Sequence, residues 1–261
     1  MRIGRLAWLF FKVGSLNELQ YRANFFIQLL QSAVAVGTAI VVLALVYSHT
    51  DELNGWSESE LLVVLAIQIL LGGIINTSIQ PNMQRFMEEV RDGKLDFALT
   101  KPEDSQVLIS VRDVRIWRAV DIFAGGAVLA YAIAGLDEPV GVGDALLFLG
   151  LLAVGTLAIY CFWIVIATLA FWIVNVWEIL ELFQGIYQAG RWPATIFPSW
   201  LRFGITFLVP LAFAITVPAE AVTSRLEWST VGLALGFSAV LFAFTRWWWG
   251  FGLRRYSGAS A

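Results

Sequence analysis

The chain has 261 residues, of which 59% are hydrophobic and only 14% are charged, with a formal net charge of −3. Soluble domains carry about 25% charged residues, so this composition excludes an ordinary water-soluble globule. One cysteine and one histidine exclude a disulfide framework and a metal cluster built from those residues.

Long stretches without a charged residue predict membrane-spanning helices. Charge is absent from residues 25–47, 61–84, 145–177 and 228–245. About 20 apolar residues are enough to cross a bilayer core of about 30 Å as a helix. The sequence therefore predicts an all-α, polytopic helical membrane protein.

The first 22 residues are basic and rich in aromatic side chains, with Arg2, Arg5 and Lys12 among the apolar residues. A segment of this composition can lie along a membrane surface with its apolar side down. We expect an interfacial helix over residues 1–22; a cytoplasmic tail before the first span is the alternative. Because Arg5 and Lys12 interrupt the apolar residues, we do not expect a cleavable signal here.

The spans that hydropathy predicts most clearly are residues 24–47, 60–80, 119–136, 145–173 and 229–249. The stretch 174–228 leaves two alternatives. Either the apolar run 203–217, interrupted by Pro210, is the fifth span, or residues 176–191 are, and 194–226 enter the membrane from outside and return. A non-helical turn at membrane depth is allowed when it is buried in protein. Both alternatives give six crossings.

The distribution of basic residues predicts that both termini are cytoplasmic. In the first alternative, every Lys and Arg except Arg225 lies on the N-terminal side; in the second, Arg191 and Arg202 are also outside. The loops 48–59 and 137–144 contain acidic residues and no Lys or Arg. Since basic residues in short loops stay in the cytoplasm, this asymmetry orients the chain.

The cytoplasmic segment 81–118 has its own predicted structure. Pro81 can open a helix, in which Met83, Phe86, Met87 and Val90 form one apolar stripe. Such a stripe could dock a soluble protein. The alternative is that it packs on the protein's own spans.

Turn signals follow this helix and predict a second one. Gly93 is placed to end the first helix, and Asp104 or Ser105 can cap the second. We expect the second helix to continue towards the third span through the apolar residues Val107, Leu108, Val111 and Val114.

Signatures of enzymes are absent from the sequence. The only Gly-Lys pair, at residues 93–94, is followed by Leu95 and is not part of a phosphate-binding loop. Acidic residues near membrane depth are Asp121, Glu178 and Glu181, which we interpret as interfacial or helix-pairing groups rather than a proton relay. An intramembrane enzyme that acts on lipid through Asp121 or Glu181 is the disfavoured alternative.

Two stretches resemble a known family. They are "VRDGKLDFALTKPEDSQVLISVRDV" (90–114), with an R-x-G-x-L-D…L-x-K-P core, and "FPSWLRFGITFLVPLAFAITVPAEAV" (197–222), with an F-P-x-W-L turn. Both are similar to segments of ABC-2 type permeases, the exporter-class subunits of ABC transporters. "ELQYRANFF" (18–26) and "LRRYSGAS" (253–260) resemble a bacterial subgroup with six spans.

The resemblance implies which segments carry function. It favours 176–191 as the fifth span, 194–226 as an outer re-entrant region, and 81–118 as the coupling region against an ATPase. Implied ATPase contacts are Met83, Arg85, Phe86, Met87, Glu89, Val90, Gly93, Lys94, Leu95, Phe97, Lys101 and Pro102. Implied residues of the outer re-entrant region are Pro198, Trp200, Pro210, Pro218 and Glu220.

The resemblance also implies the partners: an ABC ATPase subunit that binds ATP and magnesium, a second permease that is identical or paralogous, and membrane lipid, without nucleic acid. The chain itself would hold no cofactor and no metal and would not be an enzyme. The expected function is the permease subunit of an ATP-driven exporter in the bacterial inner membrane. Its cargo would be amphipathic or hydrophobic, because the deep spans carry few charges. The alternatives are an ATP-independent channel or scaffold, and import in place of export.

Overall fold

The computed structural model describes residues 2–19, 22–136, 138–173 and 177–256. In these ranges the regular secondary structure is helical, and no β-strand is present. Five helices are long and apolar enough to cross a membrane, or up to six if one bent pair counts as a span. These findings confirm the predicted all-α polytopic membrane fold.

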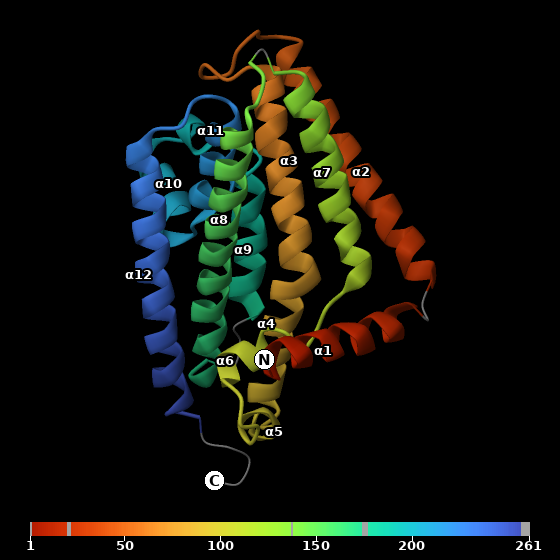
Figure 1. The fold of residues 1–261 in the computed structure, drawn as a ribbon, viewed down its shortest axis with the longest axis vertical. Helices are drawn as coiled ribbons and strands as arrows, with labels where there is room; N and C mark the ends of the chain where they lie inside the picture. Colours follow the sequence, from red (N-terminus) through yellow and green to blue (C-terminus); the bar gives the residue numbers. More distant parts are fainter. Residues whose placement is uncertain (1, 20–21, 137, 174–176, 257–261) are drawn as a thin grey trace.

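The long helices run side by side along the long axis of the molecule (Figure 1). They are α2 (Arg22–Tyr47), α3 (Glu58–Ile74), α7 (Val120–Ala134), α8 (Val142–Thr168) and α12 (Trp228–Leu253). The shorter α9 (Trp177–Ala189) lies with α3 and α8. Helix α1 (Arg2–Leu19) crosses the lower end at a steep angle to the others, as an interfacial helix would.

One helix is much longer than a membrane span requires. Helix α3 continues through the π-helical turn η1 (Ile75–Ile79) into α4 (Gln80–Arg91), a run of 34 residues. Pro81 therefore lies inside a continuous helix and does not open a separate one; it occupies the first turn of α4, directly after the π-helical turn. At 1.5 Å per residue this run measures about 51 Å, against about 30 Å for a bilayer core. Its lower part must project beyond the membrane.

Below this long helix the chain turns through α5 (Asp96–Leu99) and α6 (Ser105–Ile109), and then returns through η2 (Ile116–Ala119) to α7. Gly93 has a φ of +67° at the first turn, and the Asp104 carboxylate caps α6 by accepting from the N–H of Val107 at 3.1 Å. The predicted second helix is wrong in length, because α6 ends at Ile109 and does not reach Val114.

The segment after α9 folds back on itself. It contains η4 (Ala194–Ile196), α10 (Ser199–Phe203) with η5 (Gly204–Leu208), and η6 (Ala212–Thr216) with α11 (Val217–Val222). The two limbs meet at 79°, with Pro210 at the break. Near its ends, the Thr195 carbonyl accepts from Asn54 at 3.1 Å, and Arg225 bonds Glu60 at 2.6 Å. Both ends of the segment therefore reach the same end of the molecule.

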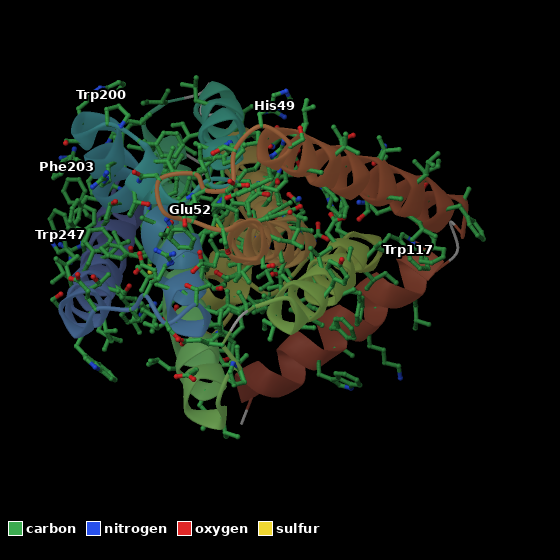
Figure 2. All side chains as sticks on the ribbon, turned by 90° about the horizontal axis from the view of Figure 1, so that it is seen from above. His49, Glu52, Trp117, Trp200, Phe203 and Trp247 are labelled. Atoms are coloured by element: carbon green, nitrogen blue, oxygen red, sulfur yellow. The ribbon has the colours of Figure 1, made fainter. Side chains whose placement is uncertain are left out.

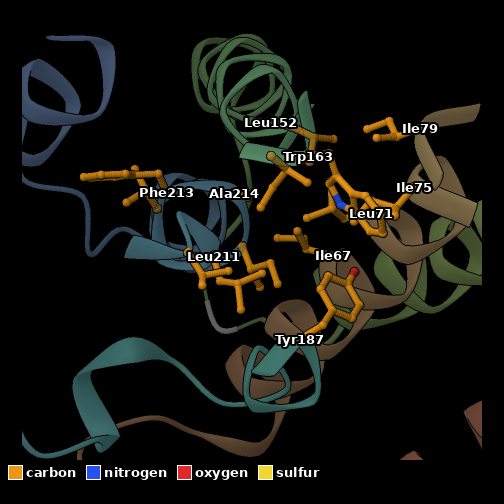
Figure 3. Close-up of a cluster of buried hydrophobic side chains, with 14 of the residues drawn as sticks. Ile67, Leu71, Ile75, Ile79, Leu152, Trp163, Tyr187, Leu211, Phe213 and Ala214 are labelled. Carbon is orange, nitrogen blue, oxygen red and sulfur yellow. The ribbon is translucent and has the colours of Figure 1, made fainter. Parts of the chain in front are cut away.

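The core lies between α3, α8, α9 and the folded-back segment (Figure 3). Trp163 is fully buried, with its ring centroid 5.0 Å from that of Phe183 on α9. The Tyr187 hydroxyl on α9 donates to the Gln68 carbonyl on α3 at 2.5 Å. Gly125 lets α7 approach α3 closely, since a Cβ there would lie 2.5 Å from the backbone N of Leu70.

Large apolar side chains also cover the outside of the helices. Trp200, Phe203 and Trp247 are exposed and lie at the outer edge when the molecule is viewed from above (Figure 2). Helices that are apolar towards the core and also outward are typical of a protein surrounded by lipid.

Candidate functional site

The lowest part of the molecule is a short projection that we call the tip, residues 92–104 (Figure 1). On its inner side, Leu95 and Ala98 are buried. On its outer side, the Phe97 ring is 78% exposed, beside exposed Lys94 and Lys101 and the exposed Pro102. Among the described residues of the tip, Phe97 is thus a large apolar side chain exposed between two lysines.

The apolar stripe of α4 points inward, which corrects part of the predicted ATPase contact. Met83, Phe86 and Met87 are buried in the chain, and Leu95 is as well. The Phe86 ring lies 5.5 Å from that of Phe171 and 5.0 Å from that of Trp249. In this structure these side chains are therefore covered by the protein's own helices, as the alternative to docking expected. Val90 is partly buried against the same core.

Several polar side chains that were predicted to contact a partner pair with other residues of the same chain. Arg85 bonds Glu89 at 3.1 Å on the exposed side of α4, and Lys94 pairs with Asp92 at 3.1 Å. The Lys101 ammonium lies 5.6 Å from the centre of the Phe10 ring, so the tip also contacts α1. Of the predicted contacts, those that remain exposed are Arg85, Lys94, Phe97, Lys101 and Pro102.

A buried side-chain amide holds the segment that returns from the tip against α4. The Asn82 side chain is buried; its oxygen accepts from the N–H groups of Arg112 and Asp113, both at 2.9 Å. Its nitrogen donates to the carbonyls of Ser78 at 2.6 Å and Asp113 at 2.7 Å. These bonds replace the helical ones that α6 would need to continue, which is why that helix stops.

An ion pair reinforces the same connection. The Arg112 guanidinium makes two bonds to the Glu89 carboxylate, at 3.1 and 2.7 Å, and the two side chains are only 7% and 17% exposed. Sequence reasoning did not single out Asn82 or Arg112. A signal existed for Asn82, because it lies four residues before Phe86, on the apolar face of α4.

A second connection ties the tip to the last helix. The Asp104 carboxylate accepts two bonds from Arg246 on α12, at 3.1 and 2.6 Å, and Arg246 also bonds Gln106 at 2.9 Å. The Trp249 indole N–H donates to the Ser105 hydroxyl at 3.1 Å. The hydrogen bonds from Arg246 lower the pKa of the Asp104 carboxyl below its usual value. The tip is thus attached to both α4 and α12.

The residues predicted for the outer re-entrant region do not form one surface. Pro198 precedes α10 and is exposed, as is Trp200. Pro210 and Pro218 are buried at the break and in the first turn of α11, and Glu220 on α11 is partly buried.

At the end opposite the tip, several contacts involve a residue that sequence reasoning did not single out as a site. Arg225 bonds the Glu60 carboxylate at 2.6 and 2.9 Å, and its guanidinium carbon lies 4.9 Å from the centre of the Trp56 ring. The hydrogen bond with Glu60 raises the pKa of Arg225. The Trp56 indole N–H donates to the Thr195 hydroxyl at 3.2 Å, so three separate segments meet here.

Asp121 pairs two helices. The amide nitrogen of Gln28 on α2 donates to its carboxylate at 3.4 Å, at the start of α7. This contact supports the interpretation of Asp121 as a helix-pairing group.

Comparison with known proteins agrees with this architecture. The family model described as "ABC-2 family transporter protein" matches residues 33–260, most of the chain. No curated protein and no solved structure matches the chain. Permeases of this family are membrane subunits of ABC transporters, which work with an ABC ATPase. The match covers all the spans except the first part of α2 and includes the tip. The chain therefore belongs to the ABC-2 family of transporter proteins.

Proposed function

We propose that the chain is the permease subunit of an ATP-driven exporter, and that the tip receives the movement of a separate ATPase. Two permease subunits, identical or paralogous, would enclose the path for an amphipathic or hydrophobic cargo. The membrane would be the bacterial cytoplasmic membrane, with the tip and both termini in the cytoplasm, as the basic residues suggest.

The observation that carries this proposal is the rigid attachment of an exposed tip to a helix that crosses the membrane. The run Glu58–Arg91 links membrane depth to the tip without a break. Asn82 and Arg112 hold the segment that follows the tip against this run, and Asp104 ties the tip to α12. A force on the tip would therefore move α3 and α12 as well. A soft loop could not transmit a difference in binding energy between two states of the permease.

The contacts at the ends of residues 194–226 support the second of the two topologies. Both ends reach the loop before α3, so the segment would enter and leave the membrane on the outer side. The fifth crossing would then be α9, although its 13 residues measure only about 20 Å. Its position with α3 and α8 supports this assignment, since Phe183 and Tyr187 on its inner face are buried.

Exposed faces of α2 and α9 are where a second permease would pack. Only 17% of the most apolar stretch of α2 is buried within the chain. On α9, Leu182 and Ile186 are exposed. A hydrophobic or amphipathic cargo fits the low charge of these faces, because a polar solute would need buried ionic partners.

The test is whether an ATPase binds through Phe97. The full chain should be purified from membranes of its own host and the associated ATPase quantified. Phe97→Ala should weaken this association by about 2 kcal/mol, roughly 30-fold in Kd, as loss of a central aromatic contact does. Phe203→Ala is the matched control, because Phe203 is also exposed but lies in the folded-back segment. If no ATPase associates, an ATP-independent channel or scaffold replaces this proposal; if both variants bind the ATPase alike, Phe97 is not the contact and the role proposed for the tip is wrong.

A further inference from the structure

We propose that a groove between the long helix and α8 holds one acyl chain of a phospholipid. The lipid would come from the leaflet that faces α1 and the tip. This inference concerns lipid binding alone and stands whether or not the tip binds an ATPase.

The groove is the space between the lower half of α3–η1–α4 and the face of α8. Its volume is about 550 Å³, within the range of about 300–1,000 Å³ of small-molecule sites. Apolar side chains make most of its walls, among them Ile74 and Met83 on the long helix and Leu149, Leu152 and Leu157 on α8. Leu149, Ala153 and Leu157 are exposed, so the groove opens sideways, towards the bilayer.

The length and position of the groove match one leaflet. Along α8 it extends from Leu149 to Tyr160, eleven helical steps or about 16 Å. Half of a hydrocarbon core of about 30 Å has the same depth. Its lower end is at Ser110, near the level of α1, since Gly14 of α1 approaches the carbonyl of Val114. Helix α1 exposes large apolar side chains, as a helix at the lipid headgroups does.

The hydroxyl groups that line the groove already donate their protons to other groups of the chain. This favours a hydrocarbon occupant over a polar one. The hydroxyls of Ser78, Thr156 and Ser110 donate to carbonyls of their own helical turns, Ile74 at 3.0 Å, Leu152 at 2.7 Å and Gln106 at 2.7 Å. The Tyr160 hydroxyl is 2.8 Å from that of Ser110. A hydroxyl has one proton to donate, so these groups offer no free donor to a polar solute. An acyl chain needs none.

The groove also has a wall that belongs to the long helical run. Ser78 lines the groove, is partly exposed, and lies on the run Glu58–Arg91 that leads to the tip. An acyl chain in the groove would therefore contact the same helix that carries the tip.

The experiment uses the full chain in vesicles of phosphatidylethanolamine and phosphatidylglycerol. A fraction of the phosphatidylethanolamine carries a diazirine midway along one acyl chain, and labelled residues are mapped by peptide mass spectrometry after irradiation. We expect labels to concentrate on residues 149–160 of α8, and Ala153→Trp, which fills the groove, to reduce them to the level of other lipid-facing residues. Val240→Trp, at an exposed position on α12, should leave the labels unchanged.

Three results would overturn the proposal. Labels could spread evenly over the exposed faces of α8 and α12, which indicates ordinary surrounding lipid. Labels at 149–160 could persist in a folded Ala153→Trp variant; Leu157→Trp replaces it if that variant does not fold. Finally, Ala153→Cys in a Cys161→Ser background could form disulfide-linked dimers in the vesicles, which would show that a second copy of the chain covers the groove.

Discussion

The part of the molecule at membrane depth and the part beyond it are held together in different ways. At membrane depth, α8 meets the folded-back segment at Gly155, where the backbone of Phe213 and Ala214 leaves no room for a side chain. Beyond the membrane, the segment that returns from the tip is held against α4 by polar bonds of Asn82 and Arg112. Lipid is as apolar as a leucine side chain, so helices in a membrane gain their association from close contact between small residues. At the tip, where water competes, buried polar groups must find specific partners, and this makes the connection directional.

This difference also explains what each end exposes. At the end opposite the tip, the Arg225 guanidinium lies over the Trp56 ring, and Trp56 is buried. At the other end, the bonds of Asn82 and Arg112 lie behind the surface and leave Phe97 exposed. The two ends therefore differ in that one buries the aromatic side chain of Trp56 and the other leaves that of Phe97 exposed.

The largest expected effect concerns the close contact at membrane depth. Gly155→Leu should destabilise the protein by about 3 kcal/mol, because a side chain there must push the folded-back segment away from α8. The measurement is the midpoint of thermal unfolding in detergent.

Gly150→Leu is the matched control, since a Cβ at Gly150 of the same helix meets nothing within 4 Å. Its midpoint should stay the same or rise slightly, because leucine favours a helix more than glycine does. Equal losses in both variants would show that close packing at Gly155 is not what holds this region.

A smaller effect is expected at the buried ion pair beyond the membrane. Arg112→Met leaves the Glu89 carboxylate without two of its bonds, and breaking a fully buried pair costs about 3–5 kcal/mol. Arg85 still bonds Glu89, so we expect a loss of about 2 kcal/mol, in the range for bonds to a charged group.

Arg85→Met is the control for this pair, because Arg85 bonds the same carboxylate from the exposed side of α4. An exposed pair of this kind contributes less than about 0.5 kcal/mol, so its thermal midpoint should hardly change. A loss at Arg85 as large as that at Arg112 would contradict the distinction between buried and exposed connections.

The smallest expected effect is a dependence on pH at the connection between the tip and α12. Arg246 lowers the pKa of Asp104 in the folded state, so this pair stabilises the protein above the usual pKa of about 3.9 and loses its effect as the pH falls through the lowered value. Both side chains are more than a third exposed, so the contribution is about 0.5 kcal/mol.

Asp104→Asn isolates the charge, because asparagine can still cap α6. Thermal midpoints of the two proteins should differ at neutral pH and converge in acid. If the difference is the same at both pH values, the carboxylate charge does not stabilise the tip.

Much of the fold could be predicted from periodicity and charge. The expected spans 145–173 and 229–249 correspond to α8 and α12 within a few residues, because a membrane span is marked by its own length and hydropathy. Local chemistry alone placed the turn at Gly93 and narrowed the cap to Asp104 or Ser105, of which Asp104 is the cap in the structure. Such features depend on a few neighbouring residues, so they can be read without the fold.

Contacts between distant parts of the chain could not be predicted in this way. Asp104 and Arg246 are 142 residues apart, and no pattern in the sequence pairs them. The groove between the long helix and α8 likewise depends on how two helices pack, and its lining residues are ordinary for either helix.

The sequence by itself determined that this is a helical membrane protein and that the chain turns at Gly93. Only the tertiary structure decided which side of α4 is covered, and so that Met83 and Phe86 belong to the core while Phe97 is exposed. The physical reason is that an apolar stripe specifies burial but not the partner that provides it. That partner is selected by the packing of Phe171 and Trp249, from helices far along the chain.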